Sequence, residues 1–208
     1  VPYEEKWLTA ISTQYGCPQH CQFCLVPELG FHGNLSVEEM WDQLEFVFNQ
    51  HPEVKLIIAP HVIDENHLVE IIRKLKRPYV RYTRADEKNV RKADCLIIDC
   101  FGLLSSIYRY GEIAYIGGGF GVGIHNTLEA AVYGIPVIFG PKYQKFQEAV
   151  QLLEAKGGFS VKSYEELKAL LDRMLEDESF LRETGTNAGT YVTGNAGATD
   201  KVLGMINF

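Results

Sequence analysis

The sequence lacks both an excess of cationic charge and any apolar run of membrane-spanning length. Its 208 residues carry 20 Lys and Arg against 27 Asp and Glu, a formal net charge of -7 at pH 7. This balance argues against a nucleic-acid-binding surface as the main function. A spanning helix needs about 20 consecutive apolar residues, and no stretch reaches that length. The first residues also lack the apolar core of a secretory signal peptide.

Cysteine is scarce as well, and its distribution excludes a further class of protein. The five cysteines are an odd number, and three of them lie in one short cluster. This pattern argues against the disulfide framework of a small secreted domain and favours a reducing cytoplasm. We find no internal repeat and no low-complexity tract. A chain of this length can bury one good core, or one domain with an appendage.

The most informative stretch is residues 115–141, YIGGGFGVGIHNTLEAAVYGIPVIFGP. Its apolar start, Ala114–Gly117, predicts a strand that leads into a glycine-rich turn. A helix is expected to begin near His125 and to end at the Gly-Ile-Pro break of residues 134–136. The apolar residues Val137–Phe139 then predict a second strand. Strand, turn, helix and strand in this order make one βαβ unit.

The turn of this unit has the composition of an anion-binding corner. Glycine lets backbone N–H groups approach a ligand without a Cβ in the way, and a helix that follows would aim its unpaired N–H groups and its dipole at the same place. Such a corner suits a phosphate, and Glu129 could accept hydrogen bonds from ribose hydroxyls. A purely structural interpretation also stands, because tight turns need glycine for steric reasons and an acid in the first turn complements the dipole.

A longer stretch of the same region, GGGFGVGIHNTLEAAVYGIPVIFGPKYQKFQEA, resembles the nucleotide-sugar-binding motif of the 3-deoxy-D-manno-octulosonic acid (Kdo) transferases of lipopolysaccharide synthesis. These glycosyltransferases have two Rossmann-like domains, the GT-B architecture. The resemblance extends from about Phe48 to Phe208 and covers the C-terminal, donor-binding domain of that family. We therefore assign residues 51–208 to a nucleotide-sugar donor-binding domain.

The resemblance implies a set of donor-binding residues. In the glycine-rich turn and the expected start of the helix they are Gly117, Gly118, Gly119, Gly121, Gly123, His125, Asn126, Thr127 and Glu129. Outside that unit they are His61, Gly102 and Lys142. Each of the last three has a structural alternative to donor binding. His61 could cap or pack at a strand end, Gly102 could be needed only for the conformation of its turn, and Lys142 could belong to a solvated face.

The sequence departs from the pattern of the family at three places. It has Pro60-His61 where Pro-Arg is commoner, and Asn66-His67 where Glu-Arg is commoner. Leu103 stands in place of a glutamate. The first two departures affect the region that supplies a cationic contact to the donor phosphate, a role that His61 could take here.

The resemblance also implies an activity. The donor would be cytidine monophosphate-Kdo (CMP-Kdo), and the sugar would pass with inversion to a lipid A precursor at the cytoplasmic face of the bacterial inner membrane. No metal or other cofactor is implied. The basic carboxylate of the family belongs to an N-terminal acceptor domain, so we expect this chain alone to bind a nucleotide sugar with little or no turnover.

Apolar runs after residue 50 predict a parallel sheet covered by helices on both faces, as in the C-terminal half of a GT-B protein. The expected strands are Lys55–Ala59, Tyr79–Tyr82, Cys95–Asp99, Ala114–Gly117, Val137–Phe139 and Phe159–Val161. The expected helices are Leu68–Leu75, Ser105–Tyr110, one that begins at Ser163 and runs to about Leu175, Asp177–Tyr191 with an interruption at Gly185, and Gly197–Phe208.

The first 50 residues follow another pattern. Cys17, Cys21 and Cys24 have the spacing C-x3-C-x2-C, which can hold three irons of a 4Fe-4S cluster, and Leu8–Ser12 before them is apolar enough for a strand. The segment resembles the start of a radical S-adenosylmethionine enzyme of the RNA-methylating branch. From Ser36 onward a capping box and an apolar stripe predict a helix. We therefore expect residues 1–50 to be a cysteine-bearing βα appendage. Three origins stay open: it is fused to the donor domain, it replaces an element of that domain, or its similarity to the superfamily is accidental.

Three functions compete on this evidence. The first is the Kdo transferase donor domain. The second is an iron–sulfur enzyme fragment that uses S-adenosylmethionine, although only about the first unit of the barrel that such enzymes need is present. A zinc site completed by a nearby histidine is a variant of this alternative. The third is a non-catalytic module that uses a Rossmann-like fold as a scaffold.

Overall fold

A computed structural model of the chain describes residues 55–60, 63–121, 123–197 and 204, together with the backbone of two short strands near the N-terminus. These two are β1 (Gln14–Tyr15) and β2 (Gly33–Asn34), which pair antiparallel. The cysteine cluster, the predicted strand at residues 8–12, the predicted helix from Ser36 and most of the predicted helix at 197–208 lie outside the described residues.

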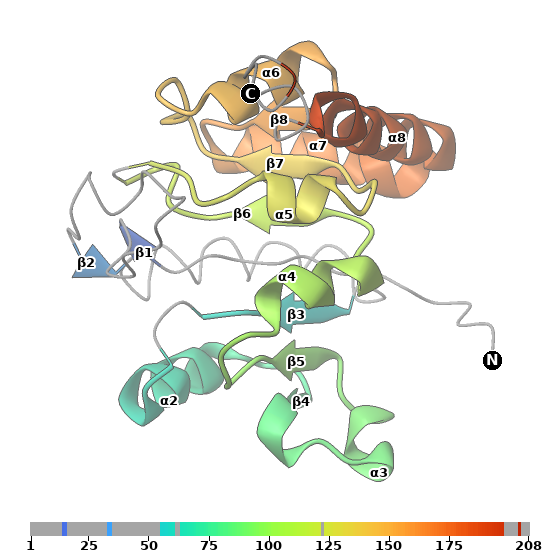
Figure 1. Cartoon of the computed structure of the whole chain (residues 1–208). Coiled ribbons are helices and arrows are strands. Elements are labelled where there is room, and N and C mark those ends of the chain that lie inside the picture. The colour runs from blue at the N-terminus through green and yellow to red at the C-terminus, as the bar shows by residue number, and fades with distance from the viewer. Residues whose placement is uncertain are drawn as a thin grey trace.

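Six parallel strands form the centre of the domain (Figure 1). β3 (Leu56–Ile58), β4 (Tyr79–Arg81) and β5 (Cys95–Ile97) make one sheet in the order β3-β5-β4. A second sheet has the order β6-β7-β8 and consists of β6 (Ala114–Ile116), β7 (Val137–Phe139) and β8 (Gly158–Ser160). Every pairing in the two sheets is parallel. Among the described residues, no ladder of hydrogen bonds joins β3 to β6.

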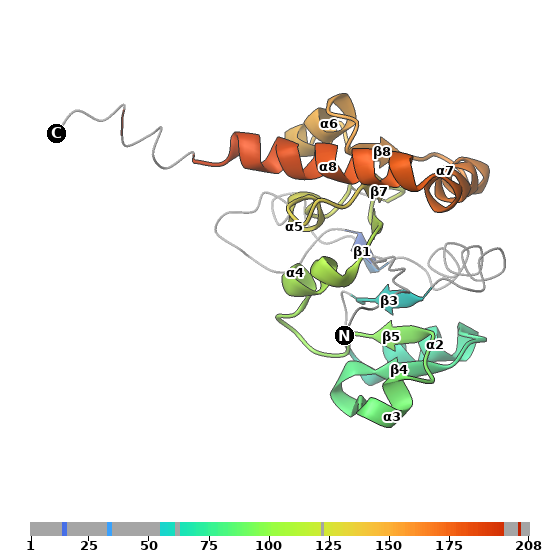
Figure 2. The same ribbon diagram turned by 90° about the vertical axis from the view of Figure 1, so that its right-hand side faces the viewer.

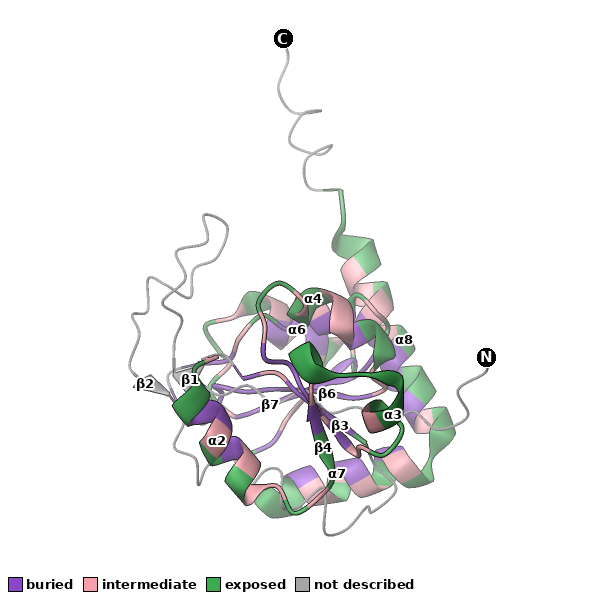
Figure 3. Cartoon of the chain, turned by 90° about the horizontal axis from the view of Figure 1, so that it is seen from below, coloured by how far each residue is buried: buried purple, intermediate pink, exposed green. Residues whose placement is uncertain are grey.

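Helices cover both faces of the strands (Figures 2 and 3). The α-helices are α2 (Glu65–Lys74), α3 (Glu87–Val90), α4 (Leu104–Ile107), α5 (Leu128–Ala131), α6 (Gln147–Glu154), α7 (Tyr164–Glu176) and α8 (Glu178–Asn195). Two short 3-10 helices are η2 (Tyr82–Arg84) and η3 (Tyr108–Tyr110). None of the helices in the described part of the chain is long and apolar enough to cross a membrane.

The strands are buried on both sides, and alternate residues serve different cores. On one face, Tyr115 and Ile138 pack with residues of β3 and β5 and with the apolar sides of α2, α7 and the start of α8. On the other face, Val137 and Phe139 pack against α5, α6 and Ala188 of α8. Because successive strand residues point to opposite faces, continuous apolar runs such as VIF are what a sheet covered on both sides requires.

Short polar side chains begin the longer helices. The Asp64 carboxylate accepts a hydrogen bond from the His67 amide at 3.0 Å at the start of α2. Ser163 receives one from the Glu166 amide at 3.3 Å, and Asp177 receives one from the Phe180 amide at 2.9 Å. Each of these contacts satisfies an N–H group that has no partner within its helix.

The parallel sheet with helices on both faces is confirmed, and each of the six predicted strands is present. Several local bounds differ from the predictions. β8 and α4 each begin one residue earlier than expected, and α2 begins at Glu65 instead of Leu68. The predicted interruption at Gly185 is wrong, because α8 continues through this residue. The helix expected from His125 begins only at Leu128 and has 4 residues.

Gly185 lies inside α8 because the helix crosses another part of the backbone at very close range. A Cβ at this position would meet the carbonyl oxygen of Gly134, and a Cβ on Gly157 would likewise meet the backbone of Ala188. Gly194, in the same helix, has no atom within 4 Å of a Cβ position. The missing side chain at Gly185 is therefore a packing requirement, which outweighs the low helix propensity of glycine.

We expect Gly185→Ala to lower the free energy of unfolding by about 1–3 kcal/mol, the usual cost of overpacking a filled interior. The matched variant Gly194→Ala should be neutral or should stabilise the chain by up to about 1 kcal/mol, through helix propensity alone. Urea titration followed by circular dichroism measures both. Equal midpoints for the two variants would contradict the close crossing of α8.

Candidate functional site

The carboxyl ends of parallel strands meet at one edge of a sheet, and this is where open α/β sheets bind ligands. Two groups of residues lie at such ends here. One group follows β6 and consists of the glycine-rich turn and residues 125–129. The other follows β4 and β5 and contains Arg81 and Asp99.

The glycine-rich turn is tightly folded. The Gly121 amide donates to the Gly118 carbonyl at 2.9 Å, and the His125 amide approaches the Gly117 carbonyl at 3.4 Å. Gly118 has a φ of 86°, in the region that favours glycine. All five glycines of the turn are buried.

Two of these glycines have a packing role. A Cβ on Gly119 would lie 2.5 Å from the amide nitrogen of Gly140, and one on Gly123 would lie 2.8 Å from the ring of Phe146. The Lys142 amide also donates to the Gly119 carbonyl at 2.8 Å. The turn after β6 and the loop after β7 are therefore in backbone contact, and the steric interpretation of glycine holds at Gly119 and Gly123.

Asn126 organises the end of the turn. Its Oδ1 accepts a hydrogen bond from the Leu128 amide at 3.0 Å, and its Nδ2 donates to Oε1 of Glu129 at 3.0 Å. Because α5 has only 4 residues, the dipole of a long helix is not available at this corner. The polar character of the corner comes from the side chains of Asn126 and Glu129 and from the amides near them.

Two buried hydroxyl groups lie near this corner. Burial of Tyr108, together with the charge of Glu129, raises the pKa of its phenol above the ordinary value. Thr127 is fully buried, and its Oγ1 has no hydrogen-bond partner among the described residues. Native proteins contain few such groups, and each calls for an explanation, such as a ligand or water that binds there.

The other residues of the predicted site are placed as follows. Gly102 is exposed with a φ of 85°, in the loop after β5, and Lys142 is exposed in the loop after β7. His125 is half-buried beside the turn. His61 and the three cysteines of the N-terminal cluster lie outside the described residues. Across the described part of the chain, no three His, Cys, Asp or Glu side chains gather as metal ligands would.

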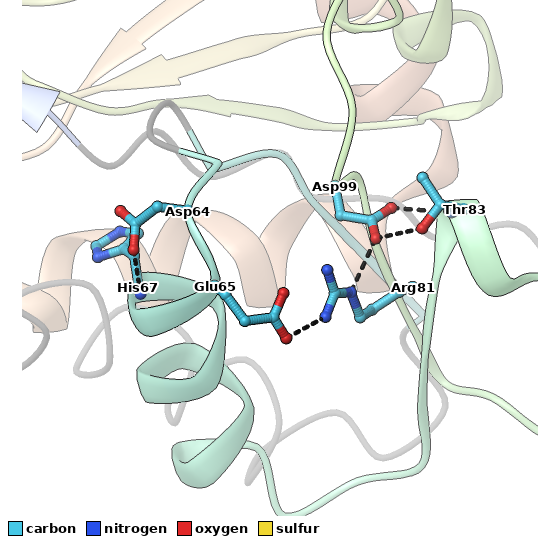
Figure 4. A network of polar contacts seen from close by, with 6 residues as sticks. All are labelled: Asp64, Glu65, His67, Arg81, Thr83 and Asp99. Carbon is cyan, nitrogen blue, oxygen red and sulfur yellow. Dashed lines mark hydrogen bonds and ion pairs between the residues drawn. The ribbon is translucent and has the colours of Figure 1, made fainter.

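The second group is a polar network that joins the ends of β4 and β5 (Figure 4). Nε of Arg81 donates to Oδ2 of Asp99 at 2.8 Å, and Nη1 donates to Oε1 of Glu65 at 2.7 Å. The Thr83 hydroxyl donates to Asp99 at 2.6 Å, and its amide donates at 2.9 Å. The Asp99 side chain is 1% exposed, whereas that of Glu65 is 64% exposed.

These contacts settle the charge of Asp99. Burial alone raises the pKa of a carboxyl group, but the hydrogen bonds from Thr83 and Arg81 outweigh burial and lower the pKa of Asp99 to about 2. The pKa of Arg81 is raised by its contacts with Glu65 and Asp99. The pair is therefore charged at neutral pH and holds the segment after β4 against the end of β5.

The sequence reasoning missed this network. Arg81 and Asp99 each stand at the end of an apolar strand, which is a usable signal for proximity once the two strands are known to be neighbours. The pairing of β4 with β5 is a tertiary fact, and the intervening residues Thr83 and Glu65 have no motif of their own.

No family model matches the chain, but individual proteins do. The 3-deoxy-D-manno-octulosonic acid transferase of Aquifex aeolicus is 36% identical over 127 residues, which is 60% of this chain and 35% of that protein. The protein of the same name from Chlamydia muridarum is 30% identical over 164 residues, 72% of this chain and 37% of that one. The chain thus spans about a third of the length of these relatives.

Among solved structures, the C-terminal CMP-Kdo binding domain of WaaA from Acinetobacter baumannii matches with a TM-score of 0.64 at 17% identity. The match covers 91% of this chain and 90% of that domain. The described fold is therefore the Rossmann-like fold of that domain, a parallel sheet with helices on both faces as in the C-terminal half of a GT-B protein. In sequence the chain is related to the Kdo transferases, so the resemblance read from the glycine-rich stretch is confirmed.

The Asp99 network predicts a pH dependence of stability. The pKa of Asp99 is lowered from the ordinary 3.8 to about 2, so its contribution is complete above pH 4 and is lost as pH falls toward 2. A shift of this size corresponds to about 2 kcal/mol. We expect Asp99→Asn to be less stable at neutral pH and to show a shallower loss of unfolding free energy between pH 4 and pH 2.

Glu65→Gln is the matched control, since Glu65 contacts the same arginine from an exposed position. Exposed ion pairs contribute about 0–1 kcal/mol, so this variant should keep nearly the full acid dependence of the unmodified chain. Denaturant titrations at several pH values measure all three proteins. Parallel pH profiles for the unmodified chain and Asp99→Asn would show that Asp99 does not hold the ends of β4 and β5 as a charged group.

Proposed function

We propose that this chain is the donor-binding domain of a Kdo transferase and binds CMP-Kdo at the corner formed by residues 117–129. The observation that carries the proposal is the pairing of Asn126 with Glu129 directly behind the glycine-rich turn, in a sequence related to transferases of that name. The solved domain with a similar fold is described as binding CMP-Kdo.

The corner offers complementary groups to such a donor. Glu129 is half-buried and oriented by Asn126, and its carboxylate can accept hydrogen bonds from the ribose hydroxyls. Backbone amides of the turn can donate to the phosphate. Lys142 is exposed on the loop that contacts the turn through Gly119, and its ammonium group can neutralise the phosphate or the carboxylate of the sugar.

The transfer itself would need the rest of a longer protein. In the proposed reaction the Kdo passes to a lipid A precursor at the cytoplasmic face of the inner membrane, with the general base supplied by an acceptor domain. The residues of the present chain then hold and orient the donor, and no metal or cofactor is assigned to them. On this proposal the isolated chain binds the nucleotide and has little or no turnover.

Isothermal titration with cytidine monophosphate tests the binding step. We expect measurable heat at micromolar to millimolar ligand, and Glu129→Ala should weaken the affinity about tenfold or more, as the loss of a charge-assisted hydrogen bond does. Glu154→Ala is the control, because Glu154 is an exposed acid at the end of α6. An absence of heat at millimolar ligand, or equal affinities for the two variants, would argue for a non-catalytic scaffold.

Thr127 allows a separate test of the same corner. If the buried Thr127 hydroxyl has no partner in the free protein, Thr127→Val removes an unsatisfied polar group and should leave the stability unchanged or raise it by up to about 1 kcal/mol. Thr184→Val is the control, since the Thr184 hydroxyl is buried and donates to main-chain carbonyls at 2.9 and 3.0 Å. A clear loss of stability in Thr127→Val, measured without nucleotide, would show that the hydroxyl is already paired.

A further inference from the structure

Positive charge is concentrated in one stretch of this acidic chain. Residues 73–92 contain nine of the 20 Lys and Arg residues and two of the 27 Asp and Glu residues. The stretch therefore has an excess of seven positive charges, within a chain whose formal net charge is -7. Electrostatic forces between exposed charges reach only about 8–10 Å at physiological salt. A partner at this stretch would meet its local positive charge and not the net charge of the chain.

The fold places this stretch along one edge of the domain. It covers the end of α2 and all of β4, η2 and α3, and β4 is an outer strand of its three-stranded sheet. Figures 1 and 2 both show β4 and α3 at the lower end of the molecule, opposite β8 and α6. The Asp94 amide donates to the Pro78 carbonyl at 2.8 Å, and Nδ2 of Asn89 donates to the Arg84 carbonyl at 2.8 Å. These contacts join the segments into one surface, which we call the cationic edge (residues 73–92).

Most charged side chains of the cationic edge are exposed, and Figure 3 looks at this end of the molecule. The exposed cations are Arg73, Lys76, Arg84, Lys88, Arg91 and Lys92. Within the described residues, none of the four that follow β4 forms an ion pair. One of the two acids has a structural role, since Oδ1 of Asp86 accepts hydrogen bonds from the amides of Lys88 and Asn89 at 2.7 and 2.8 Å.

Local structure explains only part of this charge. Arg73 and Lys74 lie in the last turn of α2, where cations complement the helix dipole. Cations on an outer strand can also prevent its pairing with another molecule. Arg81 is the one charged residue of β4, however, and it bonds to Asp99 and Glu65. The four exposed cations after β4 lie outside the strand, and α3 has only 4 residues, so neither explanation applies to them.

We propose that the cationic edge binds the anionic surface of a membrane and docks the domain there. Clusters of about four to eight Lys and Arg residues attract anionic lipid headgroups. Exposed apolar groups stand among these cations, because Tyr79, Tyr82 and Val90 are 42%, 43% and 47% exposed. Tyrosine suits the boundary between lipid and water, since its ring is apolar and its hydroxyl is polar. The choice of a membrane over a nucleic acid rests on the proposed function, whose acceptor is a lipid, whereas the charge of the surface is independent of it.

Docking through this edge would orient the rest of the domain. The strands of a sheet lie at right angles to the direction in which they are stacked. With β4 against the membrane, the strands would therefore run along its surface (Figure 1). Their carboxyl ends, which carry the corner of residues 117–129, would open sideways along the membrane and would stay accessible to a donor from solution.

Sedimentation of the full chain with lipid vesicles tests the proposal without any substitution. We expect binding to vesicles of phosphatidylcholine mixed with phosphatidylglycerol to be at least about tenfold tighter than binding to phosphatidylcholine alone. Added salt should weaken the binding, because it screens exposed charges. Equal binding to the two kinds of vesicle, or no binding to either, would overturn the proposal.

A combined variant locates the surface. Each cation close to an anionic membrane contributes about a fivefold increase in binding, so Lys88→Gln, Arg91→Gln and Lys92→Gln together should weaken binding to the anionic vesicles about a hundredfold. Circular dichroism checks that this triple variant is folded. If it does not fold, the lipid preference and the salt dependence of the unmodified chain decide the proposal.

The matched control removes the same charge from exposed positions elsewhere. Lys156→Gln, Lys162→Gln and Arg182→Gln lie outside the cationic edge and outside the proposed donor site. Together they should change vesicle binding less than about threefold. Equal losses in the two triple variants would show that only the net charge of the chain matters, and the cationic edge would then not be a docking surface.

Two further measurements separate this proposal from its neighbours. The triple variant of the cationic edge should keep its affinity for cytidine monophosphate, and Glu129→Ala should keep its vesicle binding. Loss of the lipid preference with intact nucleotide affinity would reject the docking surface alone, and the reverse result would reject the donor site alone. An RNA oligonucleotide that displaces the vesicles and does not bind the triple variant would assign the cationic edge to a nucleic acid and overturn the membrane proposal.

Discussion

The close contact between Gly119 and Gly140 is the constraint on which the candidate site depends. A Cβ on either residue would overlap the backbone of the other, so the turn after β6 and the loop after β7 can meet only where both lack a side chain. This contact and the Lys142 amide that donates to Gly119 set the path of the turn. The path of this turn leads to Asn126 and Glu129, whose side chains are joined by a hydrogen bond.

A second constraint acts at the other sheet. Asp99 is buried and ionised because Arg81 and Thr83 supply its hydrogen bonds, and this joins the ends of β4 and β5. A buried carboxylate without such partners would be costly. The proposed binding corner and this network thus belong to different sheets. Both lie at the carboxyl ends of parallel strands, where polar groups do not interrupt the hydrogen bonds between strands.

The strands were predictable because a sheet covered on both faces needs continuous apolar runs. A short run of β-branched and aromatic residues such as Val137–Phe139 fits few structures other than a buried strand. The start of α7 was predictable for a local reason as well, since Ser163 caps its first turn. The predicted interruption of the helix at Gly185 was wrong because the low helix propensity of glycine is a weak effect. At this position the close approach of the Gly134 backbone requires a residue without a side chain. The helix at His125 was wrong because Asn126 bonds to the Leu128 amide, which shortens it.

The sequence by itself determined the order of strands and helices, their approximate bounds and the residue types of the glycine-rich corner, because these follow from periodicity, turn chemistry and capping within a few residues. Only the tertiary structure decided which glycines serve packing, which carboxylate accepts the hydrogen bond from Arg81 Nε, and which strands are neighbours in each sheet. Those outcomes depend on contacts between residues far apart in the chain, such as Gly119 with Gly140 and Arg81 with Asp99. No local pattern encodes the distance between such residues, so the arrangement of the site had to come from the packed fold.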